Sequence, residues 1–124
     1  ETFPLKQFGV EEPKEHDDFL TRYIEIVKAN ISNPELDVSV IYEALGMSRT
    51  NFYRKVKTVT GLSPIELIKN IRLEAGAKLL KESDMNISEI AQHIGFSSRS
   101  YFARSFKAVY GMSPTEYQET KSQD

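Results

Sequence analysis

Two arginines, Arg54 and Arg104, stand in nearly the same surroundings, "SRTNFYRKVKTVTGLSP" over 48–64 and "SSRSYFARSFKAVYGMSP" over 97–114. A guanidinium group presents five N–H donors in a planar fork, which matches the O6 and N7 acceptors of guanine in a DNA major groove. A lysine, Lys57 or Lys107, follows each arginine by three residues. On a helix that spacing is nearly one turn, and a lysine there suits a phosphate contact. The chemistry that these residues favour is recognition of double-stranded DNA.

The two segments belong to a longer duplication. Residues 38–47 align with 87–96 at an offset of 49, and from Ser48 onward the offset is 50, so that Ser97 is one inserted residue in a turn. Thirteen positions across 38–66 then match, where average residue usage would give about two by chance. The chain therefore contains one supersecondary unit twice.

Each copy predicts a short helix, a turn containing glycine, and a second helix. Ser48 and Ser98 are expected N-caps, and Gly46 and Gly95 suit turns because glycine adopts positive φ without steric cost. Apolar residues recur at steps of three and four, and no segment shows the two-residue alternation of a strand. We expect an all-α fold of about seven helices, near 17–30, 38–45, 49–60, 64–82, 87–94, 99–110 and 114–120.

These helices are expected to form two helix-turn-helix subdomains joined by a long linker helix. The expected division is a linker or arm over 1–16, a first subdomain over 17–63, the linker helix over 64–82 and a second subdomain over 83–124. The linker helix would be about 28 Å long at 1.5 Å per residue, against about 34 Å between successive major-groove faces. One helix could thus hold the two units at neighbouring grooves. Gly76 inside it is interpreted as room for close helix packing.

The faces of the two second helices follow from spacing. One stripe is expected to be buried: Phe52, Val56 and Val59 in the first copy, and Phe102, Phe106 and Val109 in the second. The opposite face is the candidate DNA-binding surface, with Arg49, Thr50, Tyr53, Arg54 and Lys57 in the first copy, and Arg99, Ser100, Ala103, Arg104 and Lys107 in the second. Neither outward face contains an acid. A helix that enters a groove flanked by phosphates must exclude carboxylates, whereas a merely solvated face usually mixes signs.

Charge is unevenly distributed along the chain. The formal net charge of the 124 residues is −2, but residues 47–81 hold eight bases against Glu66 and Glu74. The asymmetry indicates a basic surface in the middle of the chain. No apolar run approaches a membrane span, and with no cysteine or signal segment a cytoplasmic location is the simplest expectation.

Other classes of function have less support. With two distant histidines, no cysteine and no ligand cluster at metal spacing, we expect neither an enzyme nor a metal site, and no cofactor. An alternative to DNA binding is a helical protein-interaction module on a helix-turn-helix scaffold. Such a module should present aromatic or apolar anchors, and only Tyr53 and Tyr101 would serve.

The sequence resembles the C-terminal DNA-binding domain of AraC/XylS-type transcription regulators over about 17–118. "ISEIAQHIGFSSRSYFARSFKAVYGMSPTEY" carries most of the resemblance, and "RLEAGAKLL" at 72–80 resembles the linker helix. The resemblance implies two recognition helices, about 49–60 and 99–110, in successive major grooves of a non-palindromic site. It marks Arg49, Thr50, Tyr53, Arg54, Arg99, Ser100, Ala103 and Arg104 as candidate base readers.

The implied partners are double-stranded promoter or operator DNA and, in the parent protein, RNA polymerase; the parent is a candidate dimer. "FLTRYIEIVKANI" together with "LGMSRTNFYRKVKTVTGLSP" is most similar to the versions fused to large sensors, the hybrid two-component regulators of Bacteroides type, which are membrane-anchored although this part is not in the membrane. Two positions depart from the family pattern. Tyr42 replaces a small residue, and Ala103 leaves only apolar contact, as with a thymine methyl group.

Overall fold

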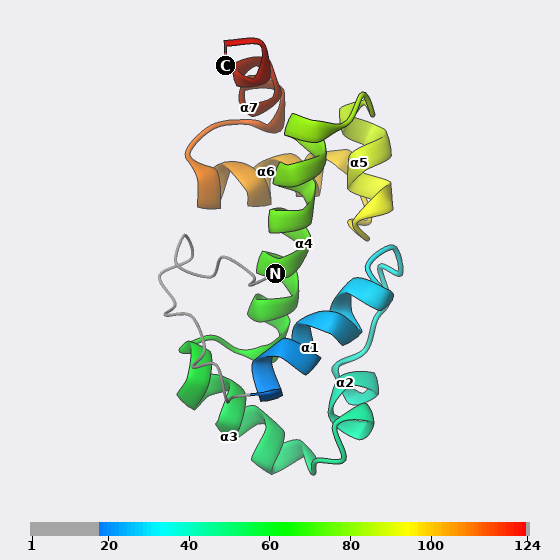
Figure 1. The fold of residues 1–124 in the computed structure, drawn as a ribbon, viewed down its shortest axis with the longest axis vertical. Coiled ribbons are helices and arrows are strands. Elements are labelled where there is room, and N and C mark those ends of the chain that lie inside the picture. Colours follow the sequence, from blue (N-terminus) through cyan, green and yellow to red (C-terminus); the bar gives the residue numbers. More distant parts are fainter. Residues whose placement is uncertain (1–17, 124) are drawn as a thin grey trace. The chain divides into compact units, whose positions relative to one another are not determined.

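The computed structural model describes residues 18–123, and within that range it contains seven α-helices and no strand (Figure 1). The helices are α1 Asp18–Ala29, α2 Val38–Ala44, α3 Arg49–Thr60, α4 Pro64–Glu82, α5 Ile87–His93, α6 Arg99–Tyr110 and α7 Pro114–Glu119, followed by a 3-10 helix, η2, over Thr120–Gln123. The expected all-α fold is confirmed, with helix ends within one residue of the predicted bounds. The terminal 3-10 turn was not predicted. The arm expected over 1–16 lies outside the described residues.

Local capping explains where α3 and α6 begin and end. The hydroxyl oxygen of Ser48 accepts from the backbone N–H of Asn51 at 3.3 Å, and that of Ser98 accepts from Tyr101 at 3.1 Å. At the other end Gly61 and Gly111 adopt φ of 77° and 78°. Left-handed backbone of this kind ends a helix and is strained for other residues. The caps and turns expected from the sequence are confirmed.

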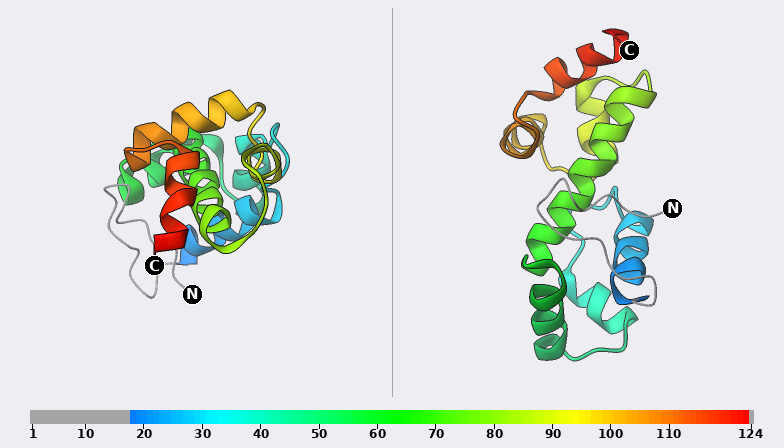
Figure 2. Two further views of the ribbon diagram at one scale, coloured as in Figure 1. Left: turned by 90° about the horizontal axis from the view of Figure 1, so that it is seen from above. Right: turned by 60° about the vertical axis from the view of Figure 1, so that its left-hand side comes forward.

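The chain divides into two compact units. The first unit comprises residues 18–30 and Leu36–Ile71, and the second comprises Ile31–Glu35 and residues 72–123. The boundary falls inside α4, which Figure 2 shows as one unbroken helix, so that α4 contributes its first part to one unit and the remainder to the other. The finer division at residues 63 and 83 stays a prediction.

An aromatic cluster forms the core of the first unit. Phe52 of α3 is fully buried, and the ring of Tyr23 from α1 stacks on it with centroids 5.5 Å apart. The ring of Phe19 meets the Phe52 ring edge-on, with centroids 6.2 Å apart. The half-buried ring of Tyr42 is tilted against the Phe52 ring, with centroids 5.7 Å apart. Each large side chain buried in this way contributes about 1.5–3 kcal/mol. The cluster therefore holds α3 by its inner face and leaves the other face outward.

The core of the second unit joins α4 to α5 and α6, with α6 crossing α4 (Figure 1). Phe102 and Phe106 of α6 are fully buried against Leu73 and Leu80 of α4. Gly76 lies at this contact, because an added Cβ atom would stand 2.8 Å from Ile94 Cδ1 and 3.2 Å from the Phe102 ring. The close packing expected at Gly76 is confirmed.

The buried stripes differ from the prediction at their last member. In α3 the stripe ends on Thr60, which is 5% exposed, while Val59 is only half-buried. Thr60 tolerates burial because its hydroxyl group donates to the carbonyl oxygen of Val56 at 2.7 Å. In α6 Val109 is 36% exposed, and the ring of Tyr110 stacks on Phe106 instead, with centroids 4.3 Å apart. The predicted burial of Val109 is therefore wrong.

Candidate nucleic-acid interface

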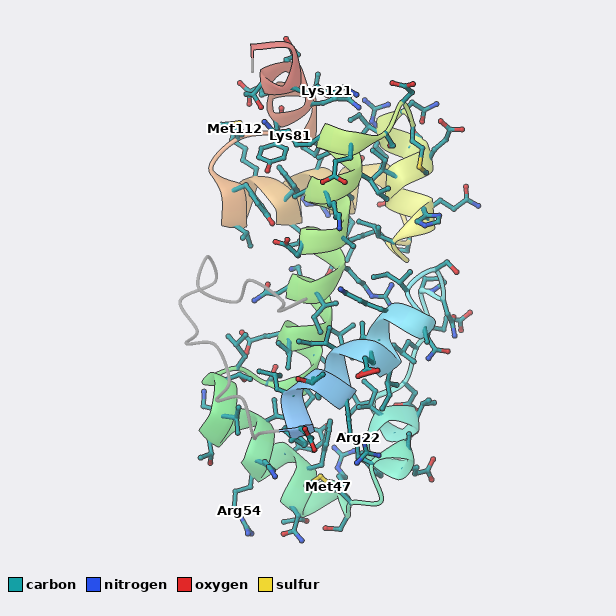
Figure 3. The ribbon with its side chains drawn as sticks, viewed as in Figure 1. Arg22, Met47, Arg54, Lys81, Met112 and Lys121 are labelled. Atoms are coloured by element: carbon teal, nitrogen blue, oxygen red, sulfur yellow. The ribbon has the colours of Figure 1, made fainter. Side chains whose placement is uncertain are left out.

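The outward face of α3 carries cations that are held in place by neighbours on the same helix. The side chain of Arg54 extends away from the helix (Figure 3) and donates from Nη1 to the Oδ1 atom of Asn51 at 3.4 Å. The Arg49 guanidinium carbon lies 4.7 Å from the centroid of the half-buried Tyr53 ring. Thr50 is exposed beside them. The helix thus presents two arginines, a hydroxyl group and an amide on one surface, and it contains no acid.

Lys57 has a role that its position in the sequence did not reveal. Its ammonium group donates to the carbonyl oxygen of Gly61 at 3.0 Å and so caps the C-terminal end of α3. Cations are favoured there by the helix dipole. The predicted phosphate contact of Lys57 would therefore compete with a bond that the free domain already makes.

The outward face of α6 is more open. Ser100, Arg104 and Lys107 are exposed, and the side chains of Arg104 and Lys107 form no hydrogen bond with any residue that the structure describes. Arg99 reaches back to the hydroxyl oxygen of Ser88 on α5 at 3.5 Å. Ala103 is half-buried, so its methyl group reaches the surface only in part.

Each recognition helix is followed by a glutamate that neighbours its last lysine. The carboxylate of Glu66 accepts a hydrogen bond from the backbone N–H of Ser63, and that of Glu116 accepts one from Ser113, both at 2.9 Å. These backbone bonds are the main cause of a lowered pKa at both glutamates, and the charges of Lys57 and Lys107 lower the two pKa values further. The repeated arrangement includes an acid at the edge of each basic face, which the spacing argument did not foresee.

Two residues were missed or misplaced by the sequence argument. Asn51 is exposed one turn before Arg54 and is hydrogen-bonded to it, and an amide of this kind can pair with adenine N6 and N7. An exposed asparagine next to a predicted base reader was the signal available. Arg72 was counted in the basic stretch 47–81, yet it is 6% exposed. Arg72 therefore does not contribute to the basic surface that the charge asymmetry indicated.

Over residues 18–123 no helix is long and apolar enough to cross a membrane. In the same range no group of three or more histidine, aspartate or glutamate side chains is placed to hold a metal ion.

Comparison with known proteins identifies the arrangement. A family model described as a helix-turn-helix domain matches residues 41–120. The chain is 36% identical over 107 residues to histidine kinase P4 of Formosa agariphila, which covers 86% of this chain and 8% of that protein. It is 34% identical over 100 residues to the HTH-type transcriptional regulator MtrA of Neisseria gonorrhoeae, covering 79% of this chain and 33% of that one. The chain thus spans a third or less of these relatives.

Solved structures share the fold. The AraC-type transcriptional regulator from Chromobacterium violaceum superposes with a TM-score of 0.78 at 27% identity, over 85% of this chain and 93% of that one. The C-terminal domain of AraT, a response regulator from Geobacillus stearothermophilus, gives 0.74 at 30% identity, over 86% and 88%. The DNA-binding domain of AdpA in complex with a target DNA gives 0.75 at 25% identity, over 86% and 96%.

Proposed function

The chain belongs to the AraC/XylS-type family of helix-turn-helix DNA-binding domains of transcription regulators, and from this premise we propose that α3 and α6 read bases in successive major grooves of one operator. The activity that we propose is binding of DNA rather than catalysis. Specificity comes from side chains on the outward faces of the two helices, and affinity comes largely from phosphates.

The observation that carries the proposal is the matched construction of α3 and α6. Both are twelve-residue helices with a serine N-cap and a left-handed glycine at the end, both expose an arginine at the same position, and neither contains an acid. Duplicated local structure could arise from packing alone. An exposed arginine, kept in both copies on a face without carboxylates, has no role in packing and fits guanine.

The base readers differ between the two helices. In α3 we assign Arg49, Thr50, Asn51, Tyr53 and Arg54 to the groove, with Asn51 and Arg54 as a bonded pair able to read adjacent bases. In α6 we assign Arg99, Ser100 and Arg104, with Ala103 limited to apolar contact. Lys57 and Lys107 are assigned to phosphates. Because α3 and α6 differ at three outward positions, Thr50/Ser100, Asn51/Tyr101 and Tyr53/Ala103, the two half-sites should differ in sequence.

Selection of bound duplexes from a random pool of 30 base pairs, at low and moderate salt, tests this function. Two enriched blocks about ten base pairs apart are expected, the separation of successive major-groove faces. A single block would mean that one helix alone reads bases. No binding of DNA at either salt would instead support the protein-interaction module, and capture of a partner protein that survives high salt would favour it further, because ionic contacts with phosphates are screened by salt.

We propose that this chain is the output end of a larger protein, a hybrid two-component regulator that acts on cytoplasmic DNA. The support is the similarity to a histidine kinase of which this chain covers 8%, and to the C-terminal domain of a response regulator. Contact with RNA polymerase and dimerisation of the parent belong to the same proposal. A phosphorylation assay on the parent protein, with promoter occupancy as the measured response, tests it.

A further inference from the structure

Arg72 is a buried cation whose hydrogen-bond partners, among the described residues, are backbone carbonyl groups and not an acid. Its guanidinium group donates from Nη1 to the carbonyl oxygens of Ile94, at 3.2 Å, and of Gly95, and from Nη2 to that of Asn33 at 2.8 Å. All four residues belong to the second unit. Burial lowers the pKa of Arg72 from its ordinary value, yet a guanidinium stays protonated in proteins. Arg72 is therefore a charged group in the folded protein, and its charge strengthens the bonds to these three carbonyl groups.

The segment that it holds is the α5–α6 turn, residues 94–98. Ile94 is the last cap residue of α5, where carbonyl groups carry partial negative charge and favour a cation. Four residues later Ser98 caps α6, so that the backbone of the turn sets where α6 begins. The third carbonyl, on Asn33, lies in the loop between α1 and α2, and Arg72 ties that loop to the same turn.

Gly95 shows how tightly the turn is held. At φ of +86° a Cβ atom there would stand 1.7 Å from Arg72 Nη1 and 2.3 Å from the carbonyl oxygen of Ile31. Its counterpart in the first copy, Gly46, has φ of +68°, but a Cβ atom there would meet nothing within 4 Å. The two turns are alike in conformation, but only the second is packed against a guanidinium group.

We infer that Arg72 is a positioning residue for DNA reading, which sets the placement of α6 by holding the α5–α6 turn, and that base reading by α3 does not depend on it. This inference rests on the proposed function. A helix must present its side chains to base edges within a fraction of an ångström, so a released turn should cost the contacts of α6 selectively.

The Arg72→Lys variant tests the inference, since lysine keeps the charge but cannot bond three carbonyl groups as a planar fork does. Affinity is measured for three duplexes: one with both selected blocks, and two in which one block is scrambled. The α6 block is defined as the one whose preference is lost in Arg104→Ala. For the wild type, scrambling either block should weaken binding about ten- to hundredfold. A wild type indifferent to both blocks would refute the proposed function itself.

For Arg72→Lys we expect scrambling of the α6 block to cost about threefold or less, with the full loss kept at the α3 block. If the variant keeps the full loss at both blocks, or loses discrimination at both equally, Arg72 does not position α6 and the inference is overturned. Gly95→Ala should reproduce the selective loss. Gly46→Ala is the matched control, because it imposes the same backbone strain without displacing a guanidinium group.

Amide hydrogen exchange of the wild type tests the same inference where a variant fails to fold. The turn amides of Gly95 and Phe96 donate to Gln92 and Ala91 at 3.1 and 2.9 Å. Those of Gly46 and Met47 make the corresponding bonds to Glu43 and Tyr42 at 3.0 and 2.9 Å. We expect Gly95 and Phe96 to exchange at least about tenfold more slowly, because opening their turn must also break the bonds of Arg72. Equal rates would overturn the inference.

Discussion

The hydroxyl group of Tyr23 donates a hydrogen bond to the carbonyl oxygen of Pro64 at 2.8 Å, joining residues 41 positions apart. Tyr23 is fully buried, and its ring stacks on Phe52 of the recognition helix α3. One side chain of α1 thus contacts both the core face of α3 and the first residue of α4. The bond contributes to the same packing that turns the outward face of α3 to solvent.

Removing this hydroxyl group should destabilise the domain without changing its fold. Tyr23→Phe keeps the stacked ring and loses one buried hydrogen bond, so the free energy of unfolding should fall by about 1 kcal/mol. Urea denaturation at neutral pH measures the change. Tyr42→Phe is a matched control, since that ring is only half-buried, and it should change stability by less than about 0.5 kcal/mol. Equal effects of the two substitutions would contradict the assigned role.

The burial of Tyr23 should also make stability depend on pH in the alkaline range. Burial, and then the neighbouring Tyr53, raise the pKa of Tyr23 above its ordinary value of 10.0. Tyr23 therefore resists ionisation in the folded state. Its contribution to stability is complete below pH 10 and is lost as pH rises, because the unfolded chain then ionises. Tyr23→Phe should make the alkaline fall in stability shallower. Chemical denaturation between pH 9 and pH 11 measures this, and unchanged slopes would refute it.

The two arginines should act on separate base positions. Arg54→Ala and Arg104→Ala should each weaken binding to the selected operator by about 1–3 kcal/mol and relax preference within one block only. Lys78→Ala removes the same charge from an exposed position of α4 and serves as control. Binding titrations combined with repeated selection measure both effects. Loss of affinity with preference intact in both blocks would reassign the arginines to phosphates.

Salt dependence should separate Lys107 from the base readers. Each neutralised phosphate contributes about −0.9 to the slope of log affinity against log salt. Lys107→Ala should therefore reduce the slope by about 1 and weaken binding to all sequences alike. Lys57→Ala should give a smaller change in slope, since Lys57 is engaged with Gly61 in the free domain. Affinities measured from 50 to 300 mM salt decide the matter, and identical slopes for both variants would contradict it.

Acid should weaken the two capping boxes that start α4 and α7. Hydrogen bonds from Ser63 and Ser113 hold the pKa of Glu66 and Glu116 below the ordinary value of 4.5. A lowered pKa stabilises the folded state above pH 4.5, and the contribution is lost as pH falls through the folded-state pKa. Glu66→Gln with Glu116→Gln should flatten this acid limb in thermal melts between pH 5 and pH 2. Glu25→Gln, at an exposed position of α1, should leave it unchanged.

The helices were predictable because their signals are local. Ser48 and Ser98 act within one turn of chain, and their caps are formed as the sequence predicted. The outward position of Arg54 followed equally from the helical period, because a stripe anchored on Phe52 leaves the opposite face to solvent. Which bases that face reads stays a prediction, since bases are contacted only in a complex.

What only the tertiary structure decided depends on neighbours distant in sequence. Arg72 reads as one more surface charge in a basic stretch, but the carbonyl groups of Asn33, Ile94 and Gly95 converge on it and make its burial possible. Val59 and Val109 lie at the edge of a stripe, where burial depends on what packs beside it. The sequence by itself determined a duplicated set of capped helices, because these bonds close within a few residues. The partner of a buried cation was decided by packing, because no local pattern encodes where a distant backbone will pass.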